Sequence, residues 1–274
     1  WTDPGIVPIG YHIANIFYHL LTAVLVFLVA SRLSSSARVA FVAAGLFVLH
    51  PVHTDSVTYI SGRRDILFTL FYLAGFYCFL RYRQLQYRRF IIAAFIMYLL
   101  SMGSKDMGVT LPAVFLAYDL IKNYGRDETA PVSGCGKALY ASLKKSLAQG
   151  WLLYALTFLG ALAFSYYKVF VKSPSLQSTY YGDSAFTTFL TVGRVLVHYL
   201  KLMLFPIRLN ADYSYNAFPL STSFFEPSTF IAFLVLMLLG YLGLKLLANH
   251  KMAAFGIAWF FITLLPVCHI FPHH

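Results

Sequence analysis

The sequence predicts an all-α fold, a polytopic membrane helical bundle of about eight spans plus one interfacial or re-entrant helix. Of its 274 residues, 59% are hydrophobic and 11% are charged, and the mean hydropathy is +0.68. A soluble domain carries roughly 25% charged and 45–50% apolar residues. So few charges could not cover a surface that faces water, which excludes an ordinary soluble domain. Apolar runs approaching the roughly 20 residues that cross a bilayer recur along the chain.

These apolar runs predict the helices in order. They fall at residues 11–31, 38–50, 66–80, 90–103, 107–121, 150–170, 185–205, 228–247 and 252–270. In the first run His12, Asn15 and His19 share one helical face, which favours polar packing between helices. The second run stops before Pro51, because proline cannot continue a helix and disfavours helix at the residue before it. We therefore expect a loop over 50–65, with Asp65 in the first turn of the next helix.

Lysine and arginine gather in alternate connections between the runs. They lie after the first run, in RYRQLQYRR after the third run, and in the 122–148 stretch after the fifth. The positive-inside rule places these connections in the cytoplasm and the 49–65 bend, the 104–108 bend and the 171–184 loop outside. We interpret 122–148 as a cytoplasmic linker within a single membrane domain, 1–274. The net charge of +11 thus predicts contact with the lipid bilayer and no nucleic acid.

The run at 185–205 leaves two topologies open. If it spans, the following loop is cytoplasmic and the segment LANHK is external. If it lies in the interface or re-enters, LANHK is cytoplasmic, as the charge rule prefers. Arg194, His198 and Lys201 share one helical face of this run, and cations at bilayer depth usually face a cavity or the interface. These residues favour a tilted helix on the external side.

Cations on the predicted external face indicate an anion site. These residues are Arg63, Arg64, Lys105, Arg194, Lys201 and Arg208. Guanidinium forks and a lysine point charge are the usual partners of a phosphate or pyrophosphate. Two structural alternatives stay open. The arginines of the 49–65 bend could extend to lipid headgroups, and Lys105 with Asp106 could form a local pair that caps a helical hairpin.

Further polar residues of the bends are candidates to line this site. They are His50, His53, His198, Arg208 and Asp212. His50 and His53 with Asp55 could suggest a metal site, but a His-x-x-His unit broken by proline is not a helical ligand pair. We therefore predict no cofactor, and a divalent metal lacks support. The catalytic residue stays unassigned, and the acidic candidates are Asp3, Asp55, Asp65 and Asp106.

Five segments together carry a resemblance to a known family. They are GYHIANIFYHLLTAVLVFLV, LHPVHTDSVTYISGRRDILFTLFYLAGF, SMGSKDMGVTLPAVFLAYDL, HYLKLMLFPIRLNADYSY and AFGIAWFFITLLPVCHIFP. Taken in order, they resemble the membrane portion of the transmembrane and tetratricopeptide-repeat O-mannosyltransferases and their bacterial relatives. The HPVHT–GRRD and SKDMG blocks are the specific part of this resemblance, which runs over nearly the whole chain.

The resemblance implies a GT-C fold and a glycosyltransferase. Such enzymes move a sugar, here most simply mannose, from a polyprenyl or dolichyl phosphate to an acceptor hydroxyl, here a protein Ser or Thr, on the external or lumenal face. The membrane would be the bacterial inner membrane or that of the endoplasmic reticulum. The resemblance also implies that run 11–31 is the family's second transmembrane helix. The loop that usually carries the acidic catalytic residue would then precede Trp1, and the repeats would follow His274.

The resemblance and the charge pattern together predict an inverting transfer. Arg63, Arg64 and Lys105 would hold the lipid phosphate, with Arg194 and Lys201 against the carrier's phosphate or the headgroups. Two other classes of function stay open. One is a non-catalytic anchor or assembly module for a repeat domain. The other is a lipid or anion transporter, which should show inverted repeats with paired broken helices; the sequence shows no such pair.

Overall fold

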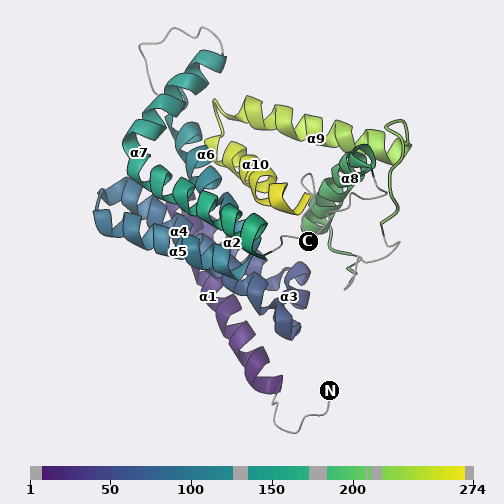
Figure 1. Cartoon of the computed structure of the whole chain (residues 1–274), viewed down its shortest axis with the longest axis horizontal. Helices are drawn as coiled ribbons and strands as arrows, with labels where there is room; N and C mark the ends of the chain where they lie inside the picture. Colours follow the sequence, from purple (N-terminus) through teal and green to yellow (C-terminus); the bar gives the residue numbers. More distant parts are fainter. Residues whose placement is uncertain (1–7, 126–134, 173–183, 208, 211–217, 269–274) are drawn as a thin grey trace. The chain divides into compact units, whose positions relative to one another are not determined.

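A computed structural model describes residues 8–125, 135–172, 184–207, 209–210 and 218–268. No β-strand occurs in these ranges, and each predicted apolar run coincides with a helix over its described residues (Figure 1). The predicted all-α class is confirmed. The chain divides into two compact units, Trp1–Leu111 and Pro112–His274. Whether they act as one membrane domain stays a prediction.

Unit 1 is a set of packed helices joined by short helical turns. The long helices are α1 (Pro8–Ser34), α2 (Ala37–Leu49), α4 (Arg63–Leu85) and α5 (Arg88–Ser104). The short turns are η1 (Pro51–His53), α3 (Thr54–Thr58), η2 (Ile60–Gly62) and η3 (Asp106–Thr110). Helix α1 packs against α2 and α4, and α4 packs against α5. Buried aromatic side chains of α4 and α5, including Phe76 and Tyr98, form the core between these two helices.

The 50–65 bend is more regular than predicted. Helix α2 ends at Leu49, and His50 is extended with φ −71° and ψ 122°, so the predicted stop before Pro51 is confirmed. Asp65 lies in the first turn of α4, as predicted. The predicted loop between them is instead a series of short helical turns, because Pro51 suits the first position of a helical turn and begins η1. The segment Pro51–Thr58 is inclined by 48° to α2.

Two glycines allow the bends of unit 1 to pack closely. A Cβ atom on Gly62 would lie 2.4 Å from the carbonyl oxygen of Ser56. A Cβ atom on Gly108 would lie 2.5 Å from the backbone nitrogen of Met102. Only glycine permits backbones to approach this closely. The glycines of the SGRRD and SKDMG segments therefore fix the shape of both bends.

Unit 2 contains the remaining long helices. They are α6 (Leu111–Asn123), whose first residue belongs to unit 1, α7 (Cys135–Tyr166), α8 (Ala185–Leu204), α9 (Pro227–Leu246) and α10 (Lys251–Leu264). A π-helical turn, η4 (Tyr167–Lys172), follows α7, and η7 (Leu265–Cys268) follows α10. Helix α7 kinks at Gly150, with φ −133° and ψ 15°. Residues 135–148 of the predicted linker therefore form the first arm of this kinked helix.

Polar contacts join the helices of unit 2. The Tyr154 hydroxyl donates to the Asp119 carboxylate at 2.7 Å, which joins α7 to α6. The Lys251 ammonium donates to the carbonyl oxygens of Lys122 and Tyr124 at 3.2 and 2.6 Å. A cation at the C-terminal end of a helix suits the helix dipole. Lys251 therefore holds the start of α10 against the end of α6.

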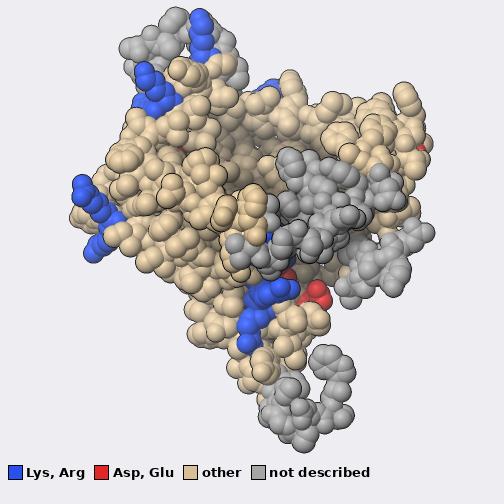
Figure 2. All heavy atoms as spheres, in the orientation of Figure 1, with Lys and Arg blue, Asp and Glu red and all other residues tan. Residues whose placement is uncertain are grey.

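Four helices in the described residues are long and apolar enough to cross a membrane: Ile9–Ser34, Ile60–Leu85, Gly136–Tyr166 and Pro227–Leu246. Counting α2 and its bent continuation as one span gives five. In the view of Figure 2, most of the described surface is uncharged, with Lys and Arg in small separate groups. The chain is a membrane protein, and its predicted total of about eight spans stays a prediction. The topology of α8, which carries Arg194 and Lys201 and is not among these helices, also stays a prediction.

Candidate functional site

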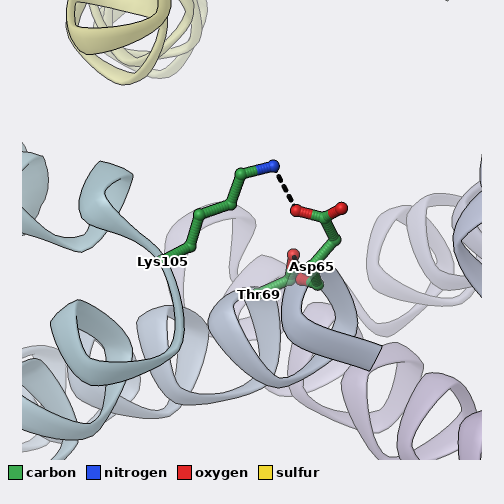
Figure 3. A network of polar contacts seen from close by, with 3 residues as sticks. All are labelled: Asp65, Thr69 and Lys105. Carbon is green, nitrogen blue, oxygen red and sulfur yellow. Dashed lines mark hydrogen bonds and ion pairs between the residues drawn. The ribbon is translucent and has the colours of Figure 1, made fainter. Parts of the chain in front are cut away.

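An ion pair joins the first turn of α4 to the bend that follows α5 in unit 1. Arg63, Arg64 and Asp65 are the first three residues of this helix. The Lys105 ammonium donates to the Asp65 carboxylate, as Figure 3 shows. The two side chains are 44% and 41% exposed, and pairs this exposed contribute on the order of 0–1 kcal/mol to stability. Both side chains therefore remain accessible to a ligand.

The backbone around Lys105 is held in place on both sides. The Lys105 N–H donates to the Ser101 carbonyl at 3.0 Å, and the Gly108 N–H donates to the Lys105 carbonyl at 2.9 Å. Lys105 itself is extended, with φ −154° and ψ 142°, so its side chain leaves the end of α5 and reaches α4 (Figure 3). The ion pair that the structure shows for Lys105 thus joins two helices.

Arg63 contacts α1 through neutral partners. Its Nε donates to the Asn15 side-chain oxygen at 3.2 Å, and its Nη2 donates to the Tyr11 carbonyl at 3.4 Å. Its guanidinium also lies 5.1 Å from the centre of the Tyr11 ring. Asn15 is fully buried and donates to the carbonyl oxygens of Val57 and Tyr59, both at 3.3 Å. Arg63 and Asn15 therefore fasten the bend to α1, whereas Arg64 is exposed.

Histidines and aromatic rings pack beside this charged turn. The His53 ring lies 4.4 Å from the Phe47 ring and 5.4 Å from the His19 ring, between centroids. His19, which is buried, also stacks on Phe47 at 5.0 Å. The polar interhelical packing predicted for the face of His12, Asn15 and His19 is thus observed for Asn15 and His19. A small, partly open cavity of about 50 Å³ lies beside these rings.

The other acidic candidates of unit 1 lie on the bends. Asp55 is exposed in the first turn of α3, and Asp106 is exposed in the first turn of η3. His50 accepts a hydrogen bond from the Val52 N–H through its Nδ1 at 3.3 Å. Within the described ranges no three or more His, Cys, Asp or Glu side chains come together in a way that could hold a metal ion. Asp65 is the acidic candidate that lines the cavity.

The predicted cations of unit 2 lie on α8. Arg194 Nη1 donates to the Pro219 carbonyl at 3.0 Å and to the Ser221 hydroxyl at 2.8 Å. Its guanidinium lies 4.9 Å from the centre of the Phe218 ring, and the His198 ring packs against the same phenyl group at 5.7 Å. Arg194 thus holds the 218–221 segment on α8.

The structure describes one of the remaining predicted site residues and leaves three outside its described ranges. Lys201 is exposed in the last turn of α8. Arg208, Asp212 and Asp3 lie outside the described residues. That the cations of both units bind one phosphate stays a prediction.

Comparison with known proteins gives a family match. The model of the family described as dolichyl-phosphate-mannose-protein mannosyltransferase matches residues 4–173. This stretch contains the GRRD and SKDMG segments, whereas α8 lies beyond it. No solved structure matches the chain.

Individual relatives cover most of the chain. Protein O-mannosyl-transferase TMTC3 of Mus musculus is 25% identical over 249 residues, which are 86% of this chain and 27% of the relative. TMTC2 of Homo sapiens is 29% identical over 255 residues, 88% of this chain and 30% of the relative. Protein O-mannosyl-transferase F38B6.6 of Caenorhabditis elegans is 22% identical over 266 residues, which are 96% of this chain and 35% of the relative. The chain thus spans about a third or less of the length of these curated relatives.

Proposed function

Because the chain belongs to the dolichyl-phosphate-mannose-protein mannosyltransferase family, we propose that it transfers mannose from dolichyl phosphate to a protein hydroxyl. The reaction would take place at the external face of unit 1, which is the lumenal face if the membrane is that of the endoplasmic reticulum. The observation that carries the proposal is the accessible Lys105, paired with Asp65 beside Arg64 within the family match.

Lys105 and Arg64 would bind the phosphate of the donor. When the bond between the sugar carbon and the phosphate oxygen breaks, negative charge grows on the departing phosphate. Fixed cations that stabilise such charge typically contribute on the order of 10²–10³ in rate. An ammonium group has three N–H donors, so Lys105 can keep Asp65 and still donate to a phosphate oxygen. Because these fixed cations would neutralise the negative charge on the departing phosphate, the proposed reaction needs no cofactor.

Asp65 is better suited to position Lys105 than to act as the base. In an inverting transfer the acceptor hydroxyl attacks the sugar from the face opposite the phosphate, and a base there takes its proton. Asp65 is bonded to the residue proposed to hold the phosphate, so it lies on the phosphate side. The proton would then pass to a carboxylate of another segment.

The proposal is tested by mannosyl transfer to a serine- or threonine-containing peptide, in membranes that express the complete protein. Lys105→Ala and Arg64→Ala should each lower transfer about 100-fold at an unchanged amount of folded protein. Arg89→Ala is the matched control. This arginine packs on Tyr87 in a connection predicted to be cytoplasmic, so transfer should stay within about twofold. Near-normal transfer by both test variants would overturn the phosphate assignment.

A further inference from the structure

Arginines gather at the end of unit 1 that lies away from the bends. They are Arg32, Arg38, Arg81, Arg83, Arg88 and Arg89. Near the first turns of α1 and α4, Asn15 contacts Arg63. Near their last turns, Arg32 donates to the Gln84 side-chain oxygen at 3.4 Å, so the two helices run in parallel. Their ends therefore lie together, and the short connections to α2 and α5 add the other arginines.

The acidic residues of unit 1 lie elsewhere. Those that the structure describes in this unit, Asp55, Asp65 and Asp106, are all on the bends at the opposite end of α4 and α5. In the view of Figure 2, a group of Lys and Arg stands at the left edge, over the ends of α4 and α5, with no Asp or Glu visible beside it. Like charges that lie close together repel each other. A bound anion would neutralise this repulsion.

Two of these arginines lie on the same side of α4. Gln84, which accepts the hydrogen bond from Arg32, follows Arg81 by three residues, and residues so spaced are neighbours on a helix. The Arg81 guanidinium lies 5.7 Å from the centre of the Phe90 ring of α5. A contact with a ring uses no oxygen acceptor, so it leaves the N–H fork of Arg81 able to bind phosphate oxygens.

An apolar stripe on α5 continues from this end. Arg88 is the first residue of α5, and Ile92, Ile96 and Leu99 follow at spacings that keep all four on one face of the helix. These four side chains are exposed, whereas Tyr98 is buried against the core. A phospholipid has the same order along its length, a charged headgroup followed by apolar chains. The stripe therefore favours a lipid over a free anion.

We propose that Arg32, Arg81 and Arg88 bind the headgroup phosphate of an anionic phospholipid, with an acyl chain along the apolar stripe of α5. Clusters of basic residues beside membrane helices attract anionic lipids, and guanidinium forks match phosphate oxygens. The connections at this end are those predicted to be cytoplasmic, so the lipid would belong to the cytoplasmic leaflet. It is separate from the sugar donor proposed at Lys105, and the inference does not depend on the proposed function.

The test measures the binding of fluorescently labelled phosphatidic acid to the complete protein in a neutral detergent. Arg32→Gln combined with Arg81→Gln removes two charges and keeps long polar side chains. This double variant should bind about 25-fold more weakly, since each basic residue near a membrane surface contributes about fivefold. Arg88→Gln alone should bind about fivefold more weakly. Thermal unfolding without lipid should stay as in the wild type, which shows that the variants are folded.

The matched control is Lys137→Gln combined with Lys144→Gln. Both lysines are exposed on the first arm of α7, which is also predicted to be cytoplasmic. This control removes the same charge as the double arginine variant, and its affinity for phosphatidic acid should stay within about twofold of the wild type. Lys105→Ala should also keep that affinity, because the proposed donor site lies at the other end of unit 1.

Several outcomes would overturn the inference. Wild-type affinity of the double arginine variant would show that these side chains do not bind the lipid. Equal weakening by the lysine control would assign binding to the net charge of the protein, and equal weakening by Lys105→Ala would place the probe at the donor site.

Competition identifies the bound group. Unlabelled phosphatidic acid should displace the probe, whereas inorganic phosphate at the same concentration should not. Displacement by both alike would indicate a site for free phosphate and contradict the lipid assignment. Phosphatidylcholine with the same acyl chains should compete poorly, and equal competition by it would show that the arginines do not select an anionic headgroup.

Discussion

The cations of the unit 1 bends and those of α8 in unit 2 are held in different ways. Lys105 reaches a carboxylate and stays 44% exposed, and Arg64 is exposed beside it. Arg194 instead contacts a carbonyl, a hydroxyl and an aromatic ring of the 218–221 segment. Arg63 of unit 1 resembles Arg194, because its partners on α1 are also neutral. A cluster of cations in a sequence can thus combine charges that bind chain segments with charges that remain accessible.

The chemistry of the side chains explains this difference. The planar guanidinium of arginine offers several N–H groups in a rigid fork, so it can bridge separate backbone segments. Arg63 and Arg194 each join segments far apart in the chain. The lysine ammonium is a compact, strongly hydrated charge on a flexible stem. Such a charge suits a ligand that arrives from solution or from the bilayer surface.

The variant expected to have the largest effect disrupts the bend that positions Lys105. In Gly108→Ala the new Cβ atom would meet the backbone of Met102 and Ser101. The bend must shift, and we expect the free energy of unfolding to fall by about 2–4 kcal/mol. Thermal unfolding of the purified protein measures this loss. Gly103→Ala, in the last turn of α5, is the matched control: apart from its chain neighbours and the backbone of its own helix, no described atom lies within 4 Å of its Cβ position, so stability should change by less than about 1 kcal/mol. Equal stability of both variants would contradict the close packing described for Gly108.

A smaller effect should separate the two kinds of arginine. Arg194→Ala and Arg63→Ala each remove hydrogen bonds from a charged group, so we expect the free energy of unfolding to fall by about 1.5–3 kcal/mol. Arg64→Ala removes an exposed side chain and should change it by less than about 0.5 kcal/mol. Chemical denaturation in detergent compares the three variants. A larger loss for Arg64→Ala than for Arg194→Ala would reverse the comparison between structural and accessible cations.

The smallest effect concerns Glu226, the residue that precedes α9. The Glu226 carboxylate accepts from the Thr222 N–H and hydroxyl and from the Ser223 N–H, at 2.9, 3.0 and 3.1 Å. These hydrogen bonds, those of Thr222 first, lower the pKa of Glu226 below its ordinary value of 4.5. A lowered folded-state pKa stabilises the fold above the unfolded-state pKa, and this contribution is lost as the pH falls through the folded-state value.

We therefore expect the melting temperature of the wild type to fall as the pH drops below about 4.5. Glu226→Gln has no carboxylate at this position and should show a smaller drop over the same range. Thermal unfolding at neutral and acidic pH measures both proteins. Identical pH dependence would show that Glu226 contributes nothing to it.

Local rules recovered the parts of the structure that depend on local sequence. Proline chemistry placed the end of α2 before Pro51, and the helix dipole placed Asp65 in the first turn of α4; both predictions are confirmed. Apolar runs likewise predicted the helices, because side chains that avoid water mark them directly. The regular turns of the 50–65 bend were missed, since short helical turns carry little periodic signal.

The contacts between distant residues could not be predicted. Arg63 meets Asn15 across 48 positions of the chain, and Arg194 meets Ser221 across 27. The cavity likewise depends on side chains from four parts of unit 1, and Phe47 and Thr69 look like ordinary residues of apolar helices. The polar face of His12, Asn15 and His19 in the first run did hint at such packing. The charge pattern therefore indicated where ionisable groups gather, and the fold showed which of them remain accessible.

Direct binding of sugar-free polyprenyl phosphate to Lys105 variants tests the central claim. Lys105→Ala should weaken binding about 10- to 100-fold, the loss expected for one charge-assisted contact. Lys105→Arg, which keeps the charge, should stay within a few-fold of the wild type. Equal affinities of the wild type and Lys105→Ala would contradict the assignment of this accessible cation to the donor phosphate.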